Sequence, residues 1–512
     1  MKLMKLRILV MMLCVVALQA HAQYKLDYEL EVSNNFGAGD FAPYFINSNT
    51  HGVISQTNAS LAKIKLKSEM DNSKRFSFGY GATLWGGVMT KTAYSRYNLE
   101  TNERELHKEA PSSLWIQQLY GELKYRSVFL VVGLKERGSN MLNDRLSSGD
   151  MTYSANSRPM PGVRAGFFTP QDIPFTNGWV QISGEIGYYK QTDAKWLENH
   201  YAYYNSFITK DLWFNYKYCY FHLKPSNPFS LTLGMQAAAQ FGGELNRYEN
   251  GKVWQNVKMT TDLSTFVRML IPGAGGNNIG DQAYVEGSHI GSWDIMGRYR
   301  FSNGSVLKAY YQSPWEDGSG IGMMNGFDGL YGIEYKSADK NSYVTGAVVE
   351  YLDLMNQGGP LHWDPVDMVG TPIVSESTGS DNYYNNYTYN GYQYYGRTIG
   401  SPVLRSPIYN TDGYLSLTDT RLRSFHVAVE GRITEDLSYR AKFARTKSWG
   451  TIFVPISVPR TSTSAMVECV YDWRNVPGLK LKGQVGLDRG SLYGNNFGML
   501  FSVSYRGMFN LK

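Results

Sequence analysis

Long apolar runs and cysteines are scarce in this sequence of 512 residues. After residue 22, no apolar run approaches the ~20 residues that a membrane-spanning helix needs. Only Cys219 and Cys469 follow that point, which excludes a disulfide framework and predicts two free thiols. Histidines are scattered, and H-E-x-x-H, paired-cysteine and G-x-S-x-G patterns are missing. We therefore expect no catalytic site, no metal and no cofactor.

A surplus of charge of one sign is also missing. Without Lys2, Lys5 and Arg7 of the first 22 residues, 47 Lys and Arg stand against 44 Asp and Glu. A chain without a basic surplus lacks the electrostatic attraction that draws a protein to a polyanion. Nucleic acid is therefore not an expected partner.

Residues 1–22 have the organisation of a secretory signal peptide. The basic start MKLMKLR precedes the apolar run ILVMMLCVVAL, and the small-x-small site QAHA ends at Ala22. Cys14 lies inside the apolar run behind the bulky Leu13, which argues against lipidation. We expect an exported chain that begins at Gln23.

Tyrosine and glycine are abundant, with 39 and 52 copies, and the mean hydropathy is −0.35. A single soluble core of this length would be unusual, because cores tend to split above ~250–300 residues. A transmembrane β-barrel fits these features, because its wall alternates apolar and polar residues and averages out as hydrophilic.

Alternation along the chain favours the same fold class. The segments 114–126, 421–434, 478–488 and 497–509 each place apolar residues on one face and polar or charged residues on the other. In the first of them, Trp115 is expected on the apolar, lipid-facing side. These segments exceed the ~5–6 residues usual in soluble sheets and fit tilted membrane crossings of ~9–11 residues.

Short and long connections alternate, as in outer-membrane barrels with periplasmic turns and extracellular loops. We predict an all-β, transmembrane antiparallel outer-membrane β-barrel of about 18 strands over residues 23–512, in which 24–34 and 162–168 are the least clearly marked strands. The short connections are 70–75, 126–127, 224–228, 302–304, 337–341, 434–436 and 475–478, and the long ones are 35–56, 90–112, 138–161, 191–210, 242–287, 317–328, 356–420, 451–461 and 490–496.

Two of the long loops are the most informative. The 242–287 loop contains TTDLSTFVRMLIPGAGG, whose apolar spacing predicts a short helix over 261–271, folded into the lumen or over the mouth. The 356–420 loop contains DNYYNNYTYNGYQYYGRTIGSP at 381–402, where tyrosines stand among Asn, Gly and Gln.

Four stretches spread over most of the chain carry a family likeness: LSSGDMTYSANSRPMPGV (146–163), GSHIGSWDIMGRYRFSNGSVLKAYYQSPWED (287–317), EYLDLMNQGGP (350–360) and DNYYNN…YYGRTIGSP (381–402). Together they resemble the Wzi capsule-assembly family, in particular its Bacteroidota-type members. The resemblance implies an 18-stranded outer-membrane barrel that acts as a lectin and holds exported capsular polysaccharide at the cell surface. Its expected partners are this polysaccharide, outer-membrane lipid and lipopolysaccharide, and a monomer is expected.

Aromatic rings stack on the C–H faces of sugars, while amides and guanidinium groups pair with hydroxyls and carboxylates. The interpretation of these loops leaves alternatives open, in which the tyrosine-rich stretch is ordered loop surface, Arg158 pairs with Asp144 or Asp150, and Trp315 belongs to an interfacial aromatic girdle. The residues predicted to bind polysaccharide are Tyr383, Tyr384, Tyr394, Tyr395, Arg397, Arg158 and Trp315.

A second function class is a channel for passive diffusion of small sugars or peptides. A channel needs an open lumen lined by charge. His426 and Ser424, the nearest approach to a catalytic pair, share the lumen face and are interpreted as polar lining. The charged residues predicted to face the lumen are Glu122, Lys124, Glu430, Arg432, Lys480 and Lys482.

Overall fold

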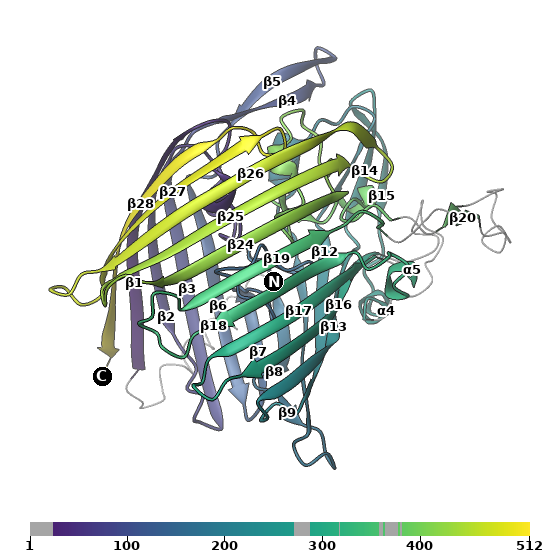
Figure 1. The fold of residues 1–512 in the computed structure, drawn as a ribbon. Helices are drawn as coiled ribbons and strands as arrows, with labels where there is room; N and C mark the ends of the chain where they lie inside the picture. The colour runs from purple at the N-terminus through teal and green to yellow at the C-terminus, as the bar shows by residue number, and fades with distance from the viewer. Residues whose placement is uncertain are drawn as a thin grey trace.

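A closed antiparallel β-barrel organises the chain in the computed structural model (Figure 1), which describes residues 24–270, 287–316, 318–357, 362–363, 377–378 and 381–511. The proposed signal peptide, residues 1–22, lies outside the described residues. One sheet of 19 strands includes the two-residue β9 (Gln171–Asp172), which pairs beside β10, so 18 strands form the wall. The last strand pairs with the first from Tyr24 opposite Leu511 to Ala38 opposite Phe497, and this pairing closes the barrel.

The predicted fold class and strand number are confirmed, including the two weakly marked strands, which are β1 and β8. The wall strands, in order around the barrel, are β1 (Tyr24–Ala38), β2 (Ala59–Ser68), β3 (Phe76–Met89), β6 (Leu114–Tyr125), β7 (Val128–Leu134), β8 (Pro161–Phe167), β10 (Val180–Lys190), β12 (Trp213–Leu223), β13 (Phe229–Phe241), β16 (Ser288–Arg300), β17 (Val306–Trp315), β18 (Gly329–Lys336), β19 (Gly346–Asp353), β24 (Leu422–Arg432), β25 (Leu437–Gly450), β26 (Pro455–Asp472), β27 (Leu479–Gly490) and β28 (Phe497–Leu511).

The remaining elements lie in the connections, and most of them lie in the long loops. They are α2 (Tyr44–Asn47), β4 (Thr92–Asn98), β5 (Glu103–Glu109), α3 (Ala194–His200), β11 (Phe207–Lys210), β14 (Glu244–Glu249), β15 (Lys252–Lys258), α4 (Leu263–Arg268), α5 (Gly318–Ile321), β20 (His362–Trp363), β21 (Ser377–Thr378), η3 (Tyr387–Tyr389), β22 (Gln393–Tyr394), β23 (Arg397–Thr398) and η4 (Pro407–Tyr409).

Short and long connections leave opposite ends of the barrel, which we call the short-turn end and the long-loop end. The seven predicted short turns all fall between wall strands at the short-turn end. An eighth connection at that end, residues 168–179, is longer and contains β9. In Figure 1 the hairpins β4–β5 and β14–β15 project from the long-loop end.

Side chains alternate across the wall as the sequence predicts. In β28, Phe501 and Val503 face outward and are exposed, whereas Leu500 and Ser502 face the lumen and are buried. The outward rows are apolar, as contact with lipid requires. Exposed aromatic residues circle the short-turn end, among them Phe76, Tyr125, Trp179, Phe229, Tyr299, Phe301, Tyr471, Trp473, Tyr505 and Phe509. Within the described ranges, no helix has the length and apolarity to cross a membrane.

One wall residue faces the side opposite to its prediction. The ladder between β3 and β6 skips Gln117, which forms a β-bulge. One extra residue reverses the facing of the residues before it. Trp115 therefore points into the lumen, where it is buried and lies 6.3 Å from Trp85 between ring centroids.

Three long loops fold back into the barrel and fill its lumen. They are residues 39–58, 135–160 and 381–421, which we call the plug. One buried cluster joins Met151 and Tyr392 of the plug to Tyr216 of the wall, together with some twenty other buried residues. A barrel of this strand number is wide enough to hold water unless side chains occupy it, and the plug occupies this one.

The helix predicted over 261–271 is observed as the shorter α4, and Ile271 lies outside the described residues. Its predicted place in the lumen or over the mouth is wrong. Phe266 packs against outward-facing Tyr188 and Phe241, at 5.3 and 5.1 Å between ring centroids. The apolar side of α4 therefore covers apolar outer wall, where Met269 also packs against Phe241.

Candidate functional site

Asp150 anchors the plug to the barrel wall. Its carboxylate accepts hydrogen bonds from the Gln236 amide at 3.1 and 3.2 Å, from the Gln312 amide at 3.1 Å and from the Ser139 hydroxyl at 2.5 Å. Asp150 is 1% exposed and both glutamines are fully buried. Because buried polar groups are costly without partners, this network holds residues 135–160 against β13 and β17.

Most of the tyrosine-rich stretch is buried in the plug. Tyr383, Tyr384 and Tyr394 are each at most 2% exposed. The Tyr384 hydroxyl donates to the carbonyl oxygen of Met151, and the Tyr394 hydroxyl lies 2.7 Å from that of Thr192. Tyrosine suits this role because its ring fills space while its hydroxyl reaches a polar partner. The exposure that direct polysaccharide contact requires is absent at these three residues.

Arg397 is likewise buried, at 3% exposed. Its guanidinium donates to the carbonyl oxygens of Ile54 at 2.7 Å and Asn47 at 3.4 Å, which joins two loops of the plug. Burial lowers the pKa of Arg397 to about 10. The predicted clamp on a sugar carboxylate is therefore replaced by backbone contacts.

Arg158 and Tyr395 are brought together by the fold. The Arg158 guanidinium lies 4.7 Å from the Tyr395 ring centroid and 5.2 Å from that of Trp115. Both predicted residues are half-buried. Among the described residues, Arg158 makes no ion pair with Asp144 or Asp150, so the pairing alternative is wrong. Stacking between two rings holds the arginine instead.

Trp315 belongs to the outer wall at the long-loop end. It is 1% exposed, lies under α5, and would contact a Cβ at Gly291 at 2.1 Å. At this exposure its indole ring is available neither to a sugar nor to the membrane interface, so Trp315 serves as a packing residue beneath α5.

His426 and Ser424 serve as lumen lining. The Nε2 atom of His426 lies 2.7 Å from the carbonyl oxygen of Leu146, and the Ser424 hydroxyl lies 2.8 Å from that of Thr446. The two side chains are thus occupied by different partners. In the part of the chain that the structure describes, no group of three His, Cys, Asp or Glu side chains could hold a metal ion. Cys219 and Cys469 are free thiols, as predicted.

An exposed aromatic platform lies on the long-loop end beside the plug. It consists of Phe207, Arg247 and Trp254 from neighbouring loops and Tyr387 from the plug itself, and none of them is among the residues predicted to bind polysaccharide. Trp254 is 58% and Tyr387 49% exposed. The Arg247 guanidinium lies 5.4 Å from the Phe207 ring and 5.9 Å from the Trp254 ring, and the Phe207 and Tyr387 centroids are 5.2 Å apart.

Two local devices position the platform. The β14–β15 ladder pairs Arg247 with Gln255 and then shifts register, so Trp254 is the extra residue of a bulge and is turned toward solvent. Tyr387 begins η3, which is tied to β11 because the Asn390 side chain both accepts from the Thr209 backbone nitrogen at 2.8 Å and donates to its carbonyl oxygen at 2.6 Å.

A polar groove of about 560 Å³ lies farther along the same end, between the ends of β1 and β3 and the β4–β5 hairpin. The two hairpins meet at Gly251, where a Cβ would lie 2.2 Å from the Tyr97 ring, so platform and groove border one surface. Hydroxyl and amide groups dominate the groove, which suits polyol ligands. Its lining includes Asp40, Thr57, Asn58, Thr90, Lys91, Thr92, Ser95 and Thr411.

Asp193 links this surface to the plug. It is 3% exposed and accepts a hydrogen bond from the Tyr395 backbone nitrogen at 3.1 Å. Burial raises the pKa of Asp193 to about 6. Because the folded pKa exceeds the ordinary value of ~3.9, folding favours the neutral form. The contribution of the neutral Asp193 carboxyl to the stability of the fold is complete below about pH 4 and is lost as the pH rises through about 6.

Replacing Asp193 with Asn should therefore remove this pH dependence. At about pH 4 the variant should match the wild type, whereas at about pH 8 its plug should be more stable by at most ~3 kcal/mol. Hydrogen exchange of the segments 191–200 and 393–397 measures the difference. Burial lowers the pKa of His200 to about 4, which acts in the opposite direction, but His200 is present in both proteins and cancels. Equal exchange at both pH values would contradict the assignment.

The closed apolar wall and filled lumen define an outer-membrane-type β-barrel whose interior is plugged. No family model matches the chain, and no curated protein does either.

Among solved structures, the chain is similar to Wzi, "an outer membrane protein involved in group 1 capsule assembly in Escherichia coli", described as a carbohydrate-binding β-barrel. The identity is 12%, the TM-score is 0.54, and the match covers 94% of this chain and 85% of that one. Acinetobacter baumannii OccAB4 matches at 12% identity and a TM-score of 0.46, over 95% of this chain and 99% of that one. Pseudomonas aeruginosa OccK5 matches at 9% identity and 0.43, over 95% and 98%. At these identities the likeness establishes the barrel fold alone.

Proposed function

We propose that this protein is an outer-membrane barrel that binds capsular polysaccharide at the cell surface and retains it there, assisting capsule assembly. In this orientation the long-loop end faces outward and the short-turn end faces the periplasm, as is usual for outer-membrane barrels. The apolar wall contacts outer-membrane lipid and lipopolysaccharide, and the protein acts as a monomer. No catalytic step and no nucleic acid are involved.

The observation that carries the proposal is the exposed platform above a filled lumen. Trp254 and Tyr387 present rings to solvent beside the Arg247 guanidinium, an arrangement that suits stacking on sugars and pairing with their hydroxyls or carboxylates. Each such contact is weak, but a polymer with repeating units engages many sites, on one protein or on neighbours, and is retained by multivalency. The likeness to a carbohydrate-binding barrel supports the same reading at the level of the fold.

The second candidate is a channel for small sugars or peptides. It is favoured by a cavity at the short-turn end that reaches the plug at Arg145. Passage would require the plug to move, since the Asp150 network and the buried tyrosines occupy the lumen. Conductance in a planar bilayer separates the two functions.

The first experiment measures binding of the purified, detergent-solubilised protein to the capsular polysaccharide of the producing cell. An unrelated polymer of similar charge is the comparison. Selective binding is expected. A protein that is shown to be folded and binds neither polymer, or both equally, would contradict retention and favour the channel.

A further inference from the structure

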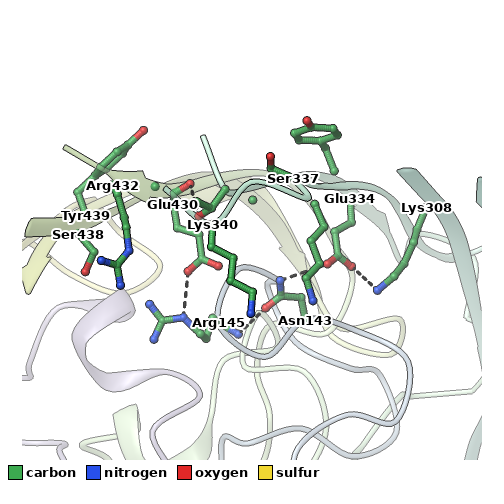
Figure 2. Close-up of a pocket in the computed structure, with 15 residues that line it drawn as sticks. Asn143, Arg145, Lys308, Glu334, Ser337, Lys340, Glu430, Arg432, Ser438 and Tyr439 are labelled. Atoms are coloured by element: carbon green, nitrogen blue, oxygen red, sulfur yellow. Dashed lines mark hydrogen bonds and ion pairs between the residues drawn. The ribbon is translucent and has the colours of Figure 1, made fainter. Parts of the chain in front are cut away.

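A second cavity lies at the short-turn end, on the opposite side of the plug from the platform (Figure 2). Its volume is about 530 Å³, within the range of sites for small ligands. Its rim is formed where wall strands begin or end, at Lys336 of β18, Gly346 of β19 and Arg432 of β24. Its floor is formed by Asn143 and Arg145 of the plug.

Positive charge exceeds negative charge in this cavity. Two ion pairs account for both carboxylates: Lys308 with Glu334 and Arg145 with Glu430, each at 2.9 Å. Glu334 also accepts from the Asn143 amide at 3.2 Å. The cations that line the cavity are Arg145, Lys308, Lys336, Lys340 and Arg432.

Three of these cations lie outside the two ion pairs: Lys336, Lys340 and Arg432. The Arg432 guanidinium donates to the carbonyl oxygen of Glu435, which leaves Lys336 and Lys340 for a ligand. In the described part of the chain, neither makes an ion pair, and both are exposed. In Figure 2 the Lys340 side chain points into the space between the Arg145–Glu430 pair and Asn143. Two ammonium groups facing one cavity repel each other, and a bound anion relieves that repulsion.

The neutral lining narrows the ligand class. Hydroxyl groups come from Ser337 and Ser438, and an amide comes from Asn143. Among the described residues that line the cavity, none is Leu, Ile, Val, Phe, Met or Trp. Such a lining cannot bury an acyl chain or an apolar peptide side chain, but it suits a polyol.

We propose that this cavity binds a short acidic saccharide from the periplasmic side, with Lys336 and Lys340 contacting its carboxylates. The assignment of the side rests on the orientation given under the proposed function. The cavity is a second saccharide site, separated by the plug from the platform, so one end of the barrel meets glycan before export and the other meets it afterwards.

The test uses the full chain in detergent and tri-galacturonate as the probe, with affinity measured by titration calorimetry at low ionic strength. The double variant Lys336→Gln/Lys340→Gln should weaken binding about tenfold or more, since each lysine supplies a charge-assisted contact. The matched control Lys74→Gln/Lys224→Gln removes two exposed lysines from other short turns and should bind as the wild type does. Maltotriose, of similar size and uncharged, should bind neither protein measurably.

Three outcomes would overturn the proposal: no binding by the wild type, equal loss in both double variants, or competition by inorganic phosphate as effective as that by the saccharide. The last would identify a site for simple anions. Trp254→Ala/Tyr387→Ala should keep the wild-type affinity for tri-galacturonate at this cavity. The proposed surface retention and the proposed periplasmic site can therefore fail independently, and each has its own readout.

Discussion

Replacing Trp254 and Tyr387 together with alanine is expected to weaken binding of the capsular polymer about thirtyfold or more. Exposed rings that stack on a ligand typically contribute ~1 kcal/mol or more each, and a loss of ~2 kcal/mol corresponds to about thirtyfold. Multivalent attachment amplifies the loss, because every site along the polymer is weakened. Binding to immobilised polysaccharide measures the effect, and heat-shifted gel mobility verifies that the barrel is folded.

A matched control exists at the other end of the barrel. Phe175 and Tyr343 are 103% and 73% exposed in connections at the short-turn end, and replacing both with alanine removes the same number of solvent-exposed rings. This variant should bind the polymer as the wild type does. If both double variants lose affinity equally, or if neither does, the platform is not the polymer site.

Replacing Asp150 with alanine is expected to release the plug and open the lumen. The change leaves the buried Gln312 amide without its carboxylate partner and removes one of the two carboxylates to which the buried Gln236 amide donates, the other being Asp294 at 2.8 Å. The unsatisfied Gln312 donor and the lost Gln236 contact together cost ~2 kcal/mol, which shifts the ratio of docked to undocked plug about thirtyfold. In planar bilayers the wild type should conduct little, and the variant should show frequent openings.

The control for this experiment is Asp412→Ala, which removes an exposed carboxylate that accepts a local hydrogen bond from the Tyr414 backbone nitrogen at 3.0 Å. It should conduct as little as the wild type. Large steady conductance in the wild type would instead favour the channel function. If the wild type and both variants all conduct little, the rest of the buried cluster holds the plug in place without Asp150.

Much of the architecture could be predicted from local pattern. A side-chain period of two residues marks each wall strand, and it remained readable in β24, β27 and β28 because one face meets an apolar environment and the other a polar one. The prediction for Trp115 was wrong because a single extra residue, Gln117, forms a bulge and reverses the facing of the residues before it. Trp115 and Ile116 are both apolar, so alternation does not show which of them faces the lipid. The neighbouring β3 strand specifies that register.

The candidate site was less predictable, and the tyrosine-rich stretch shows why. A tyrosine such as Tyr383 or Tyr394 suits an exposed sugar-binding surface, and it suits equally a buried core in which its hydroxyl finds a polar partner. Tyr387, in the same stretch, is the residue that becomes half exposed. Nothing in the local sequence distinguishes these tyrosines, although Trp254 in another long loop was a visible candidate.

By itself the sequence determined an 18-stranded antiparallel barrel with short turns at one end and long loops at the other. The reason is that the alternation of residue types within each strand shows which of its side chains face lipid and which face the lumen. Only the tertiary structure decided that three of the long loops fill the lumen and that Phe207, Arg247, Trp254 and Tyr387 meet outside it. The contact between Phe207 and Tyr387 joins two loops that lie far apart in the sequence. Its formation depends on the space that closure of the barrel creates, and that space is a property of the whole wall.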